Sequence, residues 1–270
     1  MRATAVRRTV LSASAVTLAL LATACGGGDD DAAHAERKES AAAASSSAAA
    51  AKALTAAELE KAVVATADLK GETAEEPSED DVADLGTVKA GTAECQPVAS
   101  VLRALPVDEP AASIQRLVTL ESEAAKKGMP SMEELAKMSE KEAEDATLDS
   151  LDITKTMTSL WSYDGDGAAK ALDAIRAAGE SCAKGFALTD GDDKSQVTGV
   201  IADKVTAGED TVAWTVKEKV DGEPVETKVT VFRQGSTLAG FSSFNIAAAT
   251  RGEAYEHPTA LIEAQAAKLG

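Results

Sequence analysis

The chain has 270 residues, a formal net charge of −18, and 44% hydrophobic but only 3% aromatic residues. Residues 1–24 hold three of the 27 basic residues and no acidic residue, which leaves 24 basic against 45 acidic residues, a net charge of −21. This acidic excess argues against nucleic acid as a partner, because phosphate binding requires basic patches. It also argues against direct adhesion to an anionic lipid surface.

The first 24 residues have the proportions of an export signal. Arg2, Arg7 and Arg8 form a positively charged N-terminal region, as in secretory signals. The uncharged run over 9–24 is too rich in Ala, Ser and Thr for a membrane-spanning helix, which needs about 20 strongly apolar residues. Arg7 and Arg8 also resemble a weak twin-arginine motif, so the export route stays open between the general secretory and twin-arginine systems.

Small residues directly before a cysteine resemble the bacterial lipobox, in which the thiol is acylated before cleavage. Here they are Leu21, Ala22, Thr23, Ala24 and Cys25. We therefore predict that residues 1–24 are a lipoprotein signal peptide and that palmitate-type acyl chains on Cys25 anchor the chain at the extracytoplasmic face of the cell membrane. More than one acyl chain is expected, since a single chain binds membranes only marginally. The alternative is an ordinary secretory signal followed by an incidental cysteine.

Residues 25–53 contain Gly, Ala, Ser and charged residues but no large apolar residue. Nothing in this segment can offset the entropy of ordering it, so we predict a disordered tether. Residues 54–270 are predicted to form a single domain of ordinary size.

Helix signals dominate the first part of this domain. Thr55 and Glu58 have the spacing of a capping box, and Gly71 is a natural helix stop. In chain order we predict a helix over 55–69, an acidic loop over 72–86, a helix over 92–105, a strand over 112–121, a polar helix over 131–145, a strand over 151–162 and a helix over 167–184.

From residue 195 the apolar residues alternate with period two, as in strands. Turns are marked by Asp221-Gly222 and Gln234-Gly235. We predict a four-stranded antiparallel meander and a last helix over 258–268. The fold class is therefore α+β: an antiparallel sheet, made of this meander plus one or two earlier strands, packed by helices in a single domain.

Cys95 and Cys182 are the only cysteines after Cys25. Two cysteines in an oxidising, exported setting usually pair, so we predict a Cys95–Cys182 disulfide. The alternative is two free, buried thiols.

Catalytic motifs are scarce, and we predict a non-catalytic protein without metal or cofactor. His34 lies in the tether and His257 precedes a helix, where we interpret it as a surface or capping residue. Calcium at 164–167 or 190–193 is the less favoured interpretation, because neither segment has the spacing of an EF-hand loop. The helically spaced Met132, Leu135 and Met138 are interpreted as packing residues.

A cleft on the sheet is the remaining candidate site. Met157, Trp161 and Tyr163 fall on one face of a predicted strand and are our candidate ligand-binding residues. For Trp161 packing in the core is the favoured interpretation, and a place in the cleft is the alternative.

The order of elements resembles a known family. The chain combines the lipobox, an L-T-x-x-E-L helix start, a cysteine heading a short helix, SLWSY, AGESCAKGF, VFRQGSTLAGFSSFN and a final A-x-x-Q-x-x-K-L helix. Over 54–269 this is similar to actinobacterial lipoproteins related to the extracellular sensor domain of mycobacterial serine/threonine protein kinase H. The resemblance implies an antiparallel sheet with a ligand-binding cleft and no catalysis. The sensor carries two disulfides where this chain can form one, and 124–148 is an additional charged helical segment, so no cleft residue is transferred.

We therefore expect a membrane-anchored, sensor-like lipoprotein that binds a small ligand or envelope component. A structural or assembly lipoprotein acting through protein contacts is the first alternative. A hydrolase with an unrecognised site, which would need a serine beside His257 or a deep cleft holding two carboxylates, is the second.

Overall fold

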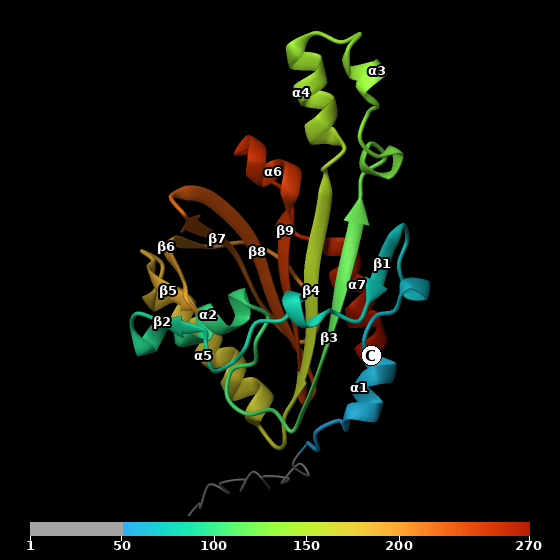
Figure 1. Cartoon of the computed structure of the whole chain (residues 1–270). Coiled ribbons are helices and arrows are strands. Elements are labelled where there is room, and N and C mark those ends of the chain that lie inside the picture. Colours follow the sequence, from blue (N-terminus) through green and yellow to red (C-terminus); the bar gives the residue numbers. More distant parts are fainter. Residues whose placement is uncertain (1–50) are drawn as a thin grey trace, which may run out of the picture. The chain divides into compact units, whose positions relative to one another are not determined.

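The computed structural model describes residues 51–270, which fall in one compact unit. The predicted signal peptide, Cys25 and the tether up to residue 50 lie outside the described residues. Nine strands form one antiparallel sheet in the order β1-β3-β4-β9-β8-β7-β6-β5-β2 (Figure 1). They are β1 (Glu72–Glu75), β2 (Lys89–Ala90), β3 (Ala112–Glu121), β4 (Ile153–Ser162), β5 (Phe186–Asp190), β6 (Asp193–Ala202), β7 (Asp210–Val220), β8 (Glu223–Gln234) and β9 (Thr237–Asn245).

Helices cover both faces of the sheet. The helices of the described chain are α1 (Ala56–Ala62), α2 (Gln96–Leu102), α3 (Met132–Leu135), α4 (Glu140–Asp149), α5 (Gly167–Ser181), α6 (Ile246–Arg251) and α7 (Thr259–Leu269). Of these, α3 and α4 lie in the connection between β3 and β4, beyond the end of the sheet (Figure 1). One core lies between the sheet and α2 with α5, and includes Trp161 and Trp214. The second lies between the opposite face and α1 with α7, where Phe232 and Phe241 stack with ring centroids 5.9 Å apart. No helix within residues 51–270 is long and apolar enough to cross a membrane.

The predicted α+β class is confirmed, with more strands than expected. Segment 112–121 is the predicted strand, and the four-stranded meander is present as β6 to β9. The prediction missed β1, β2, β5 and α6. In β5, Phe186 and Leu188 are buried while Ala187 is exposed, so the period-two alternation begins before residue 195. The two edge strands are short and polar, and only pairing with β3 and β5 makes them strands.

The first predicted helix is shorter than the capping box suggested. The box of Thr55 and Glu58 is present, but α1 ends at Ala62 because Val63 turns into extended backbone. Val64 then donates its N–H to the Gln265 side-chain oxygen at 2.9 Å. Burial of Val63 and Val64 against α7 therefore overrides the local helix preference.

The predicted helix over 131–145 is two helices. Ser131 caps α3 with Glu134, and Ser139 caps α4 with Glu142, each as a capping box. The second box stops the first helix and starts another. The expectation that Met132 packs is wrong, because this side chain is 82% exposed.

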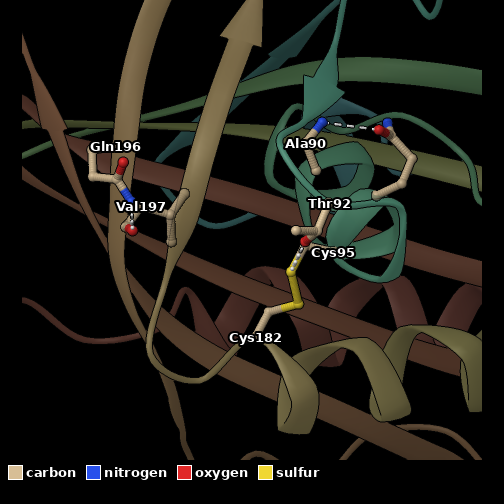
Figure 2. Close-up of a disulfide and its surroundings, with 7 residues drawn as sticks. Ala90, Thr92, Cys95, Cys182, Gln196 and Val197 are labelled. Carbon is tan, nitrogen blue, oxygen red and sulfur yellow. Dashed lines mark hydrogen bonds between the residues drawn. A yellow bond between two sulfur atoms is a disulfide. The ribbon is translucent and has the colours of Figure 1, made fainter.

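The predicted disulfide joins the ends of α2 and α5, the two helices that cover the sheet face carrying Trp161 and Trp214. Cys95 directly precedes α2 and Cys182 directly follows α5, with Cα atoms 5.8 Å apart (Figure 2). The bond closes a separation of 87 residues, which in the chain-entropy model stabilises the folded state by about 4–5 kcal/mol. Ile175 of α5 and Cys182, which directly follows α5, are both buried.

Candidate functional site

Residues 76–88, here called the strap, connect β1 at one edge of the sheet to β2 at the other. Because its two ends lie at opposite edges, the strap must cross the sheet, and Figure 1 shows this segment passing in front of β3 and β4. It crosses the face that carries α2. Two grooves lie between the strap and the sheet.

The first, here called the Arg103 groove, has a volume of about 400 Å³. Its floor is formed by Met157 of β4 and Ser242 of β9, which are register partners. Its walls are the strap and the end of α2. The charged groups are one arginine and five aspartates: Arg103, Asp80, Asp81, Asp84, Asp190 and Asp193.

Arg103 is fixed by two carboxylates. Its guanidinium donates to both oxygens of Glu218, at 2.7 and 3.3 Å, and its Nε lies 3.3 Å from Asp190. Glu218 is only 3% exposed, and it also accepts a hydrogen bond from the Ser195 hydroxyl. A bidentate pair of this kind orients the guanidinium strongly. Arg103 is therefore a rigid part of the groove wall.

Ala104 follows in a left-handed conformation, with φ of 56°. Its carbonyl accepts hydrogen bonds from the Gln115 amide at 2.8 Å and the Ser159 hydroxyl at 3.0 Å. A non-glycine residue at positive φ is unfavourable by about 1–2 kcal/mol. The two hydrogen bonds hold this conformation, which sets the direction in which Arg103 leaves the helix.

The second, here called the Trp161 groove, has a volume of about 570 Å³ and lies between the strap and β3. Trp161 contributes one edge but is itself 1% exposed, so its core interpretation also holds. Its ring packs on Gly240, where an added Cβ would lie 2.4 Å from Trp161 Cη2. A side chain at position 240 would therefore displace the tryptophan.

The three candidate binding residues thus have different places. Met157 lines the Arg103 groove and Trp161 edges the Trp161 groove. Tyr163 lies in the core, and its hydroxyl donates to the Val107 carbonyl at 2.7 Å. Burial raises the pKa of Tyr163 above its usual range. Tyr163 lines neither groove, so it supports the site only by holding the turn before β3.

His257 is not a surface residue. Its Nε2 lies 2.9 Å from Asp203, and its Nδ1 lies 3.0 Å from the Thr230 hydroxyl. A hydroxyl, an imidazole and a carboxylate are therefore hydrogen-bonded in series. However, the Thr230 side chain on β8 is 0% exposed, so no substrate can reach its hydroxyl. Neither groove reaches these residues. The arrangement ties β8 to the segment before α7.

The network lowers the pKa of Asp203. Burial by itself raises this pKa, but hydrogen bonds from Thr215, at 2.6 Å, and from His257 outweigh it. The sequence indicated none of this, because Asp203 and His257 are 54 residues apart.

The two segments considered for calcium have other contacts. Asp164 accepts the N–H of Ala53 at 3.1 Å, and Asp166 pairs with Lys170 at 2.9 Å. Asp166 occupies the N-cap position of α5 without a side-chain capping bond. Asp190 belongs to the Arg103 groove. Across residues 51–270, no cluster of three or more His, Cys, Asp or Glu residues is placed to hold a metal ion.

Sequence reasoning missed Arg103 and Glu218. Glu218 continues the inward-facing series of Val212, Trp214 and Val216 on β7. A carboxylate at an inward position of an otherwise apolar series predicts a buried cationic partner. That pattern could have identified Glu218, but its partner on α2 depends on the fold.

No family model matches the chain, and no curated protein matches it by sequence. Among solved structures, it is similar to the extracellular domain of PknH from Mycobacterium tuberculosis, with a TM-score of 0.45 and 8% identity over 81% of this chain and 95% of that one. The motifs over 54–269 resemble those of the same domain, and the structural similarity concerns the fold alone.

Proposed function

We propose that this chain is a lipid-anchored, extracytoplasmic, non-catalytic protein whose sensor-like domain binds a ligand or envelope component under the strap. The N-terminal sequence, with its charged start, apolar run and Cys25, supports the anchor. The Cys95–Cys182 disulfide supports an oxidising location, where such bonds persist.

The observation that carries the binding function is the Arg103 groove. A connection between opposite sheet edges crosses a sheet face and leaves a groove of about 400 Å³, within the size range of small-molecule sites. The Arg103–Glu218 pair and the Ala104 carbonyl bonds hold its wall in one conformation. A preorganised wall lowers the entropic cost of binding.

The charge of the groove selects the ligand class within this proposal. Five aspartates face one arginine, and Glu218 together with Asp190 already neutralises that arginine. The remaining carboxylates of the strap and of β6 favour a ligand with positively charged groups. A purely apolar lipid chain would leave these carboxylates desolvated without a partner.

A binding screen with polyamines and amine-bearing cell-wall fragments tests this function by calorimetry. We expect saturable 1:1 binding that is weakened at least tenfold by Asp80→Asn with Asp193→Asn. The matched control, Glu140→Gln with Glu144→Gln, changes the net charge equally on α4 and should leave binding unchanged. Equal weakening by both pairs, or turnover of a bound compound, would contradict the proposal.

A further inference from the structure

Residues 122–152, here called the arm, leave the sheet between β3 and β4 and contain α3 and α4 (Figure 1). Glu121 and Ile153 are register partners, so the arm starts and ends at neighbouring positions at one end of the β3–β4 pair. The other end of these ten-residue strands carries the start of the described chain, where Leu54 donates to Ser162 at 2.9 Å. Ten residues of strand span about 30 Å. The arm therefore projects from one end of the sheet, and the described chain begins at the opposite end.

The arm has almost no core of its own. Within 122–152 only Ala125 and Ser150 are buried, and no residue of α3 or α4 is buried. Its helices begin with capping boxes, and Arg251 of α6 ties α4 to the domain through Asp149 at 2.6 Å. A segment with so few buried contacts lies at the low end of local stability. Its shape is not explained by a contribution to the domain core.

Three of the exposed large apolar side chains belong to the arm. Eight large hydrophobic residues are exposed in the described chain, and four of them belong to the arm or to the strand leading into it. They are Leu120, Met129, Met132 and Met138. Met129 and Met132 are 62% and 82% exposed. Methionine is flexible and polarisable, and it is common at surfaces that bind partners of varied shape.

The charges of the arm are mostly negative. The arm holds nine Asp and Glu residues against four lysines, which leaves a net charge of −5. Three of the lysines already pair with acidic residues of the arm, at distances of 2.6–3.2 Å. Exposed carboxylates such as Glu140 and Glu144 are left without an ion-pair partner among the described residues. The field that a partner meets is therefore negative.

We propose that the arm is a docking surface for a basic, amphipathic segment of a second protein. Apolar side chains of that segment would cover Met129, Met132 and Met138, and its Lys or Arg residues would meet the carboxylates of α4. A second copy of this chain does not fit, because the same acidic surface would face itself. An anionic lipid surface is disfavoured for the same electrostatic reason. The inference does not depend on the Arg103 groove binding a ligand.

Site-specific photocrosslinking in the cells that produce the full-length chain tests this inference. p-Benzoylphenylalanine replaces Met132 on the arm or, as the matched control, Val220, an exposed apolar residue at the β7–β8 turn. We expect a crosslink to one other protein from position 132 only. Mass spectrometry of the adduct should locate it in a basic segment with interspersed apolar residues.

The charge requirement is tested in the same experiment. Adding Glu140→Gln with Glu144→Gln should reduce the yield of this adduct at least fivefold without changing the thermal midpoint of the domain. Amide exchange provides a second readout, because the partner peptide should slow exchange in 122–152 of the parent chain. A dimer adduct, a lipid adduct, equal adducts at positions 132 and 220, an acidic partner segment, a yield insensitive to the glutamine variants, or no adduct would overturn the proposal.

Discussion

Replacing Arg103 with methionine tests whether the wall of the groove depends on the buried pair with Glu218. The substitution keeps most of the apolar stem but leaves Glu218, 3% exposed, with only the Ser195 hydroxyl as a side-chain partner. Removing one member of a buried ion pair costs about 3–5 kcal/mol, because the remaining charge stays buried without compensation. We therefore expect Arg103→Met to lower the free energy of unfolding by about 3 kcal/mol.

The opposite substitution should be milder. In Glu218→Gln the side chain is neutral, and Arg103 is 24% exposed and still contacts Asp190, so a loss of about 1–2 kcal/mol is expected. The double variant should resemble Glu218→Gln alone, which gives a coupling energy of about 3 kcal/mol in a double-mutant cycle. Urea unfolding of the mature chain measures all four free energies. A larger loss for Glu218→Gln than for Arg103→Met would refute this reasoning.

Three further predictions concern the surroundings of the groove and the second core. Ala104→Gly should raise the free energy of unfolding by about 0.5–1 kcal/mol in the same urea assay, because glycine accepts positive φ without strain; a loss would show that Ala104 is not strained. The lowered pKa of Asp203 contributes stability that is present above the ordinary carboxyl pKa, near pH 4, and is lost as pH falls through the folded value. In Asp203→Asn, the thermal unfolding midpoint should therefore fall less between pH 5 and pH 3 than in the parent. An unchanged pH profile would contradict the role of the His257 network. Cys95→Ser with Cys182→Ser should cost up to about 4–5 kcal/mol, and thiol reductant should lower the thermal midpoint of the parent but not of this variant.

The elements that the sequence predicted well are those with strong local patterns. The meander alternates apolar and polar residues with period two, and the strand over 112–121 and the helix over 167–184 were also predicted. The disulfide followed from the number of cysteines and the predicted export. Each of these features depends on periodicity or composition, which are properties of short segments.

The missed features depend on contacts between distant segments. β1 is a strand only because it pairs with β3. α1 ends early because the Gln265 side-chain oxygen accepts a hydrogen bond from the Val64 N–H. The groove requires the strap to run between opposite edges of the sheet, which no local pattern indicates. The Glu218 side chain was detectable as a polar residue in an inward series, whereas Arg103 was not identifiable as its partner.

Mass spectrometry of the N-terminal peptide, from the chain purified from cell membranes, decides whether the first mature residue holds the domain outside the membrane. We expect a peptide that begins at Cys25 and carries acyl chains, with residues 1–24 absent, and a Cys25→Ser chain that leaves the membrane fraction. A membrane-bound chain that retains residues 1–24, or one whose Cys25 is unmodified, would contradict it.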